Sequence, residues 1–238
     1  MQTIGVERRA ELATCTNEIA RKLGTEFGGL HFQSSAIGDV VHCAPVHIAV
    51  PKLAADVTNE IGCTMENGVG ESEMDVLMAL HACDTATDDA ILHGITNNAS
   101  IIVVSPCCHK EVRRQLESHN GQVAAFAASG SNSNVSNIIS SEVHPLSNVL
   151  MHGIYRERHA EMLTDTLRAL CLELAGYETK IFEFVSGEHT TKNTMIAATK
   201  RTLPLTDAKK EAAVKKIREL MASCGIRSQR LVSMLQIC

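Results

Sequence analysis

The stretch "VLMALHACDTATDD", residues 76–89, decides the fold class, because an apolar run passes directly into a polar cluster and then into a helical pattern. Val76–Leu80 is short and apolar throughout, which is typical of a strand covered on both faces. Asp84–His93 follows as a helix start, with Thr87 or Asp84 available as the N-cap. The stretch therefore predicts a strand, a polar turn and a helix.

The same arrangement recurs along the chain. Ile101–Val104 ends in "SPCCH" and precedes a short helix at Lys110–Ser118. Upstream, the run Thr3–Val6 ends in Glu7 and precedes the helical pattern Arg8–Leu23, which Gly24 closes. A further short strand is expected at 30–34 together with Ile37. This alternation predicts an α/β fold with a doubly wound, mostly parallel sheet and helices on both faces.

The C-terminal half closes the sheet. "RERHAEMLTDTLRALCLELAGY", residues 156–177, is the clearest helix, and two strands joined by a polar turn follow at Thr179–Val185 and Asn193–Thr199. Because the connecting turn is short, the last strand should be antiparallel. We expect a domain at 1–200, with an insertion at about 42–72 and a mobile loop at about 121–141, and a basic helical extension at 201–238.

Three polar clusters follow the carboxyl ends of predicted strands: "LHACD", "SPCCH" and the turn "SGEHTTKN", residues 186–193. Ligands of open α/β sheets collect outside the carboxyl ends of the strands. The topology therefore sends the three clusters to one edge of the sheet, where they would line a small-molecule pocket. Glu7 also ends a strand, and either accepts two hydroxyl hydrogen bonds from a ribose or simply favours its helix N-terminus.

A metal or thiol site is the alternative interpretation of the same clusters. Donor atoms are available from His81, Cys83, Cys107, Cys108 and His109. However, no C-x-x-C spacing occurs, adjacent cysteines rarely bind one ion together, and a disulfide between neighbouring cysteines is strained. We therefore expect buried, reduced cysteines beneath a pocket and no metal.

Composition narrows the class of protein. The chain has 238 residues, 45% hydrophobic and 21% charged, which is ordinary for a soluble globular domain, and no apolar run is long enough to span a membrane. An N-terminus with early charges and an odd count of nine cysteines predict a reducing, cytoplasmic location. From Lys200 onward nine Lys/Arg face three acids, a net +6, whereas the remainder carries −11. The basic segment either contacts RNA phosphates or is a solvated helix face.

Four stretches together resemble class I S-adenosylmethionine-dependent methyltransferases. They are "DVLMALHACDTATDDAI", "IIVVSPCCHKE", "HGIYRERHAEMLTDTLRALCLELAGY" and "EHTTKN". The resemblance points to the family with a strand-end LHACD and a PCC motif, found in bacterial proteins and in the glutathione S-transferase C-terminal-domain-containing protein. It covers Met74–Lys200 strongly and Ile4–Ser35 weakly. A looser likeness, in the histidine–x–cysteine and "CCH" motifs, links the chain to eukaryotic tRNA 2′-O-methyltransferases.

The resemblance implies a Rossmann-like sheet of order 3-2-1-4-5-7-6 with an antiparallel last strand, S-adenosylmethionine as cofactor and RNA as acceptor. It implies cofactor contacts at Glu7 (the ribose acid), Ala36, Ile37, His81 and Ala82, and catalytic or positioning roles for Asp84 and His81. The acceptor side would be lined by Cys107, Cys108, His109, Glu188, His189, Lys192 and Asn193.

One part of the family pattern has no counterpart in the sequence. The family places a strand and a glycine-rich turn ahead of the ribose acid, but only six residues precede Glu7. We therefore expect a sheet without its central first strand. Two hypotheses compete with methyl transfer: a non-catalytic methyltransferase-like module that binds RNA or protein through its basic tail, and a zinc or thiol module.

Overall fold

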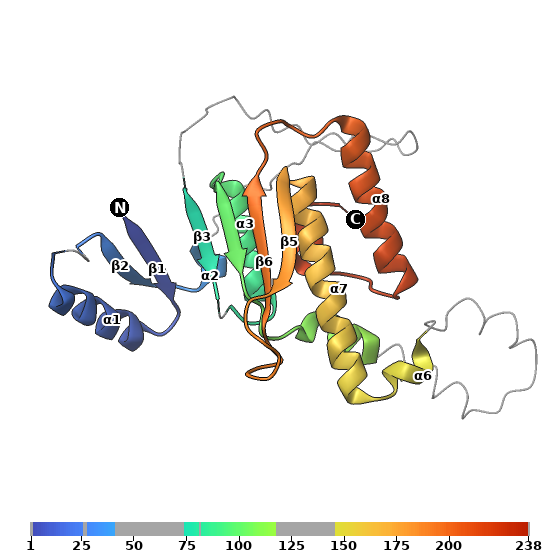
Figure 1. The fold of residues 1–238 in the computed structure, drawn as a ribbon, viewed down its shortest axis with the longest axis horizontal. Helices are drawn as coiled ribbons and strands as arrows, with labels where there is room; N and C mark the ends of the chain where they lie inside the picture. The colour runs from blue at the N-terminus through green and yellow to red at the C-terminus, as the bar shows by residue number, and fades with distance from the viewer. Residues whose placement is uncertain (1, 26–27, 41–73, 81, 118–145, 238) are drawn as a thin grey trace, which may run out of the picture. The chain divides into compact units, whose positions relative to one another are not determined.

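The computed structural model describes residues 2–25, 28–40, 74–80, 82–117 and 146–237 (Figure 1). The chain divides into two compact units, Met1–Ala44 and Pro45–Cys238. The predicted insertion at 42–72, the predicted mobile loop at 121–141 and His81 lie outside the described residues. Among the described residues, no helix has the length and apolar character needed to cross a bilayer.

The first unit is a β–α–β motif. Strands β1 (Thr3–Glu7) and β2 (Leu30–Ser34) pair in parallel, and the helix α1 (Ala10–Leu23) connects them. Gly24 follows the last residue of α1 with a φ of 100°, a backbone conformation that favours glycine. The predicted strand residue Ile37 is wrong, because it begins the short helix α2 (Ile37–Val40). The ladder ends at the pair Glu7–Ser34, so a longer β2 would have no backbone partner there.

The second unit is built on a four-stranded sheet of order β3-β4-β6-β5. Its strands are β3 (Val76–Ala79), β4 (Ile101–Val104), β5 (Tyr177–Glu183) and β6 (Thr194–Lys200). β3 and β4 are parallel, whereas β6 is antiparallel to both β4 and β5. The predicted antiparallel last strand is therefore present, in a mixed sheet with helices packed on it.

The six strands of the described residues form two separate sheets, whereas the resemblance implies one sheet that lacks its central first strand. In the implied order 3-2-1-4-5-7-6, that first strand would lie between the second and the fourth. Within the described residues no strand pairs with both β1 and β3. The continuous sheet is therefore not formed by this part of the chain.

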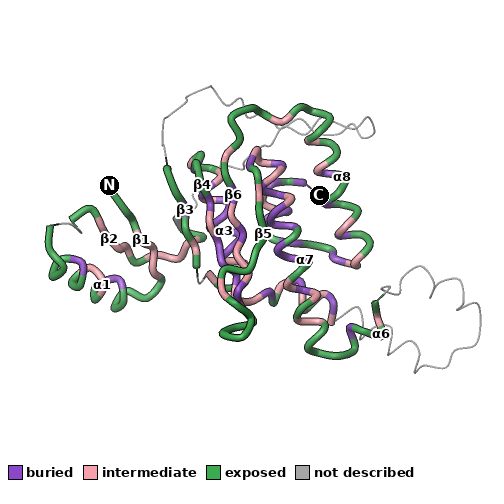
Figure 2. Tube along the Cα trace, in the orientation of Figure 1, coloured by how far each residue is buried: buried purple, intermediate pink, exposed green. Residues whose placement is uncertain are grey.

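Helices cover one face of the four-stranded sheet. α3 (Thr85–Thr96) packs on β3 and β4, and α7 (Gly153–Leu174) packs on β5 and β6, where Leu77, Ile102 and Ala198 are buried. α9 (Arg230–Met234) contacts both helices. The alternate residues of β3 are exposed, Val76 by 45% and Met78 by 68% (Figure 2). The predictions of helices on both faces and of a strand covered on both sides are therefore wrong for the described residues, since these helices share one layer.

The C-terminal segment packs onto the same layer. α8 (Asp207–Ser223) lies against α7 and buries Val214 and Ile217, while the unpredicted α9 buries Leu231 and Val232 between α3 and α7. Residues 110–117 are helical, as predicted, and the single turn α6 (Ser147–Leu150) precedes α7. The basic segment thus supplies part of the hydrophobic core of the second unit.

Candidate functional site

The carboxyl ends of β3 and β4 meet at one edge of the sheet. Cys83 follows β3 and Cys107 follows β4, and their sulfur atoms lie 3.0 Å apart. The Ser105 hydroxyl after β4 donates a hydrogen bond of 3.1 Å to the carbonyl of Thr194, the first residue of β6. Because β5 runs in the direction of β3 and β4, the turn 184–193 leaves the same edge. The predicted convergence of the three clusters is confirmed for the described residues.

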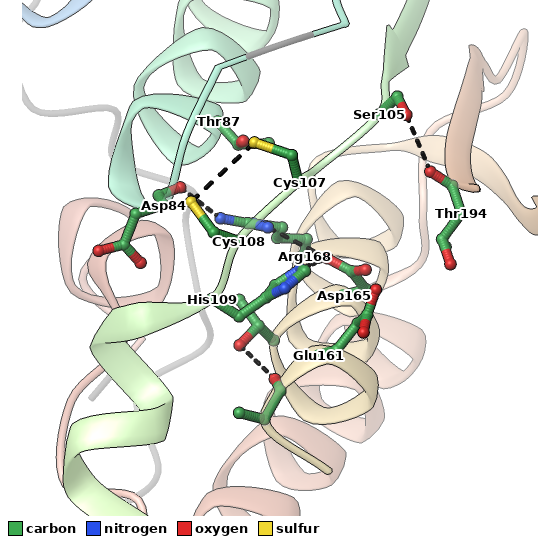
Figure 3. A network of polar contacts seen from close by, with 12 residues as sticks. Asp84, Thr87, Ser105, Cys107, Cys108, His109, Glu161, Asp165, Arg168 and Thr194 are labelled. Atoms are coloured by element: carbon green, nitrogen blue, oxygen red, sulfur yellow. Dashed lines mark hydrogen bonds and ion pairs between the residues drawn. The ribbon is translucent and has the colours of Figure 1, made fainter. Parts of the chain in front are cut away.

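Three thiols gather at this edge, and we call Cys83, Cys107 and Cys108 the thiol cluster. The Cys107 and Cys108 sulfur atoms are 4.0 Å apart, and Figure 3 shows them directed toward each other. Burial, followed by the hydrogen bond with Cys83, raises the pKa of the Cys107 thiol to about 12. Burial also raises the pKa of Cys108, which a hydrogen bond from the Asp84 backbone partly opposes. The three cysteines are free thiols, but the prediction that they are buried is wrong, because Cys83 is exposed and Cys107 and Cys108 are half-buried at the open end of the strands.

Asp84 ties together the segments around the thiol cluster. Its Oδ1 accepts a hydrogen bond of 3.0 Å from the backbone N–H of Glu111, and its carbonyl accepts one of 2.8 Å from Arg168 Nη2. Its backbone angles, φ 54° and ψ −123°, are rare for a residue with a side chain. Such strain persists only where surrounding contacts hold it, and it is common at functional sites.

The predicted cap of α3 is wrong. Asp84 occupies the N-cap position, but its side chain makes no capping bond to α3 and instead accepts from Glu111, at the start of the next helix. The Thr87 hydroxyl donates to the carbonyl of Ala82, a predicted cofactor contact that is half-buried in this turn. Both polar side chains are thus used to fix the turn between β3 and α3.

A buried ion network lies beneath the edge. Arg168 is 1% exposed and donates two hydrogen bonds to Asp88, of 2.9 and 2.8 Å, and one of 3.1 Å to Asp165. Gln229 adds a bond of 2.7 Å to Asp88. Burial alone would lower the pKa of Arg168, but the two carboxylates outweigh it and raise that pKa. The network joins α3, α7 and the C-terminal segment through fully desolvated charges.

His109 extends this network toward the thiol cluster (Figure 3). Its Nε2 lies 2.9 Å from Asp165 Oδ1, and the residue is 3% exposed. Since Asp165 also accepts from Arg168, its carboxylate is the acceptor and Nε2 carries the hydrogen. Within the described residues, the buried Nδ1 atom has no hydrogen-bond partner. His109 thus lies beneath the edge, behind the two cysteines that precede it.

The turn after β5, residues 184–193, contains the third polar cluster at this edge of the sheet. Asn193 is buried and holds the turn by donating a bond of 2.8 Å to the Val185 carbonyl. Lys192 Nζ pairs with Glu161 at 3.2 Å and with Glu157 at 3.5 Å. Glu188 and His189 are exposed, and their backbone N–H groups donate to Ser186. Lys192 is therefore already paired with carboxylates of α7.

Sequence reasoning missed the polar ridge of α7. Glu157, Glu161, Asp165 and Arg168 follow one another at helical spacing, and each contacts a residue of the edge or the network. The signal was present in "RERHAEMLTDTLR", where charges recur every three or four residues beside the apolar stripe. A helix that packs against the rest of the protein and carries charges every three or four residues is expected to have polar partners on its packed face.

The first unit holds the other predicted cofactor contacts. Glu7 Oε1 accepts two bonds of 3.0 Å, from the backbone N–H and from Nε of Arg9. The backbone hydrogen bond, followed by the side-chain bond, lowers the pKa of Glu7. Ala36 and Ile37 are half-buried at the start of α2. The unit therefore presents an ionised carboxylate at the carboxyl end of β1.

Comparison with known families gives one result. Residues 1–115 match a family model described as a methyltransferase domain. No curated protein and no solved structure matches the chain at a significant level. The matched range runs from β1 to the helical residues 110–117 and so includes Glu7, Asp84 and the thiol cluster. Residues 1–115 are therefore similar to methyltransferase domains.

Proposed function

We propose that this protein transfers the methyl group of S-adenosylmethionine to RNA, as a member of the methyltransferase family with LHACD and PCC motifs. The observation that carries the proposal is the methyltransferase-domain match over residues 1–115, because it includes the segments that end at Glu7 and at Asp84. The free thiols are consistent with a reducing, cytoplasmic compartment.

The residues of the first unit suit the cofactor. A ribose offers two hydroxyl donors, which an ionised carboxylate at a strand end can accept. The lowered pKa of Glu7 keeps its carboxylate ionised at neutral pH. Within the described residues, both contacts of that carboxylate use Oε1, so Oε2 is left for a ribose hydroxyl. Ala36 and Ile37 would contact the adenine.

The residues of the sheet edge would align the acceptor. S-adenosylmethionine supplies an electrophilic methyl group, so the protein mainly has to hold the nucleophile in line with it. Asp84 is our candidate for orienting or deprotonating that nucleophile, because its Oδ1 and backbone carbonyl are held by hydrogen bonds while Oδ2 accepts none within the described residues. Ala82 lies in the same turn, and His81 precedes it in the sequence. The acceptor side would include Cys107, Cys108, His109, Glu188, His189, Lys192 and Asn193.

RNA is the proposed acceptor because of the charge asymmetry of the chain. The segment from Lys200 onward carries a net +6, and Lys209, Lys215 and Lys216 of α8 are exposed. Ion pairs reduce this charge locally, since Lys210 lies 3.6 Å from Asp207 and Lys215 lies 3.7 Å from Glu219. The phosphate attraction would therefore be moderate and sensitive to salt.

The test is transfer of labelled methyl groups from S-adenosylmethionine to total RNA. Asp84→Asn should lower the rate by about 10²- to 10⁴-fold if the carboxylate removes a proton, while keeping an acceptor for the Glu111 N–H. The matched control is Asp75→Asn, at an exposed acid just before β3. Salt-dependent RNA binding without any methyl transfer or cofactor affinity would overturn the proposal in favour of a non-catalytic module.

A further inference from the structure

We propose that the thiol cluster binds one zinc ion, through the sulfur atoms of Cys83, Cys107 and Cys108. The Cys107 sulfur lies 3.0 Å from that of Cys83 and 4.0 Å from that of Cys108, and all three lie within 4.8 Å of one another. A tetrahedral zinc ion with Zn–S bonds of about 2.3 Å holds its sulfur ligands about 3.8 Å apart. The three sulfur atoms are therefore already close to ligand spacing.

The fold brings these ligands together although the sequence spacing gives no metal motif. Cys83 belongs to the turn after β3, and Cys107 and Cys108 belong to the segment after β4. Parallel pairing of the two strands places both turns at one edge. A C-x-x-C motif is not needed for such a site, because Cys83 comes from the turn after one strand and the two other ligands come from the segment after its neighbour.

Negative charge lies beside the thiol cluster, which favours the binding of a cation there. The Asp84 carboxylate follows Cys83 at this edge, where its Oδ1 accepts a hydrogen bond from the backbone N–H of Glu111. Beneath this edge, Arg168 is held by two carboxylates, so it cannot also compensate the sulfur atoms.

The site would keep one open position. Cys83 is exposed and Cys107 and Cys108 are half-buried, so water reaches the cluster from one side. Three protein ligands and a water molecule are the pattern of zinc sites that exchange a ligand, whereas closed structural sites have four protein ligands. Binding would release the thiol protons to solvent, because thiolates are the ligands. This inference does not depend on the proposed methyl transfer.

The experiment is a competition titration of Zn²⁺ between the full chain and a chromophoric chelator, in phosphine-reduced buffer. The test protein keeps the cluster and buried Cys171, and the other cysteines are replaced by serine: Cys15, Cys43, Cys63, Cys224 and Cys238. We expect one zinc ion per chain, and an affinity at least about 100-fold lower in Cys83→Ser. In the wild-type background, Cys15→Ser is the matched control and should leave the affinity unchanged.

Two results would overturn the proposal: a protein that takes up no zinc, or a Cys83→Ser variant whose affinity stays within about threefold of its parent. Cys83 is exposed, so its replacement should not disturb folding, which circular dichroism checks. Mass-spectrometric mapping of alkylated thiols in the wild type gives a second readout. Zinc should protect all three cluster cysteines together, and protection confined to other cysteines would contradict the site.

Discussion

Each of the two units contains an amphipathic helix with apolar residues at helical spacing, but the two helices differ in how far those apolar side chains are buried. In α1 of the first unit, Ile19 is 50% exposed and Leu23 is 57% exposed, and only Ala13 and Ala20 are buried. In α8 of the second unit, Ile217 is 0% exposed. A helical period therefore predicts that a helix forms, but the partner that covers its apolar face decides how much that face stabilises the fold.

The polar contacts of the units differ in the same way. In the first unit they are local or span one motif, as when Asn17 of α1 bonds the backbone N–H and carbonyl of Phe32 in β2. In the second unit the pair Arg168–Asp88 joins residues 80 positions apart and is fully buried. We expect stability to depend on long-range pairs in the second unit and on local structure in the first.

The largest expected effect is that of Arg168→Met. Removing the guanidinium leaves Asp88 and Asp165 buried without their cation, which should lower the free energy of unfolding of the second unit by about 3–5 kcal/mol. Urea denaturation measures the loss. Arg158→Met changes an exposed arginine of the same helix and should cost less than about 0.5 kcal/mol. Equal costs would mean that the network contributes no specific stability.

A comparable but purely apolar effect is expected for Ile217→Ala in α8. The side chain is fully buried against α7, so its truncation should cost about 2–5 kcal/mol through lost burial and a residual cavity. The same denaturation experiment measures it. A cost below about 1 kcal/mol would show that α8 is not part of the cooperative core.

The smallest expected effect is that of Ile19→Ala in α1, the matched substitution in the first unit. Half of this side chain is exposed, so the free energy of unfolding should change by less than about 0.5 kcal/mol. Paired with Ile217→Ala, it measures the difference between the units directly. A cost similar to that of Ile217→Ala would show that the α1 face is covered in the folded protein.

Much of the fold followed from the sequence because its elements are short and sharply punctuated. The apolar runs that became β3 and β4, and the helix closed by Gly24, were predicted within a few residues. The sequence did not predict that helices pack on only one face of the sheet. An apolar strand such as Val76–Ala79 has the same residue pattern whether one face or both faces are packed. The short helix α9 was missed because five residues carry no resolvable period.

The candidate site followed from the sequence in outline only. Strand order predicted that the clusters after β3 and β4 lie at one edge, because parallel strands end there together, and the structure brings Cys83 and Cys107 into contact at that edge. Pairing partners could not be predicted: Asp84 was a candidate cap of its own helix but accepts from Glu111, and Lys192, expected on the acceptor side, pairs with Glu161. Such choices depend on distances between segments far apart in the chain.

The most direct test of the account is calorimetric titration of the full chain with S-adenosylmethionine. We predict binding at one site, weakened at least about tenfold by Glu7→Ala. Glu11→Ala should have no effect, since Glu11 is an exposed acid in the first turn of α1. Absence of any binding would contradict methyl transfer by this chain, and equal affinity of the wild type and Glu7→Ala would contradict the ribose role of Glu7.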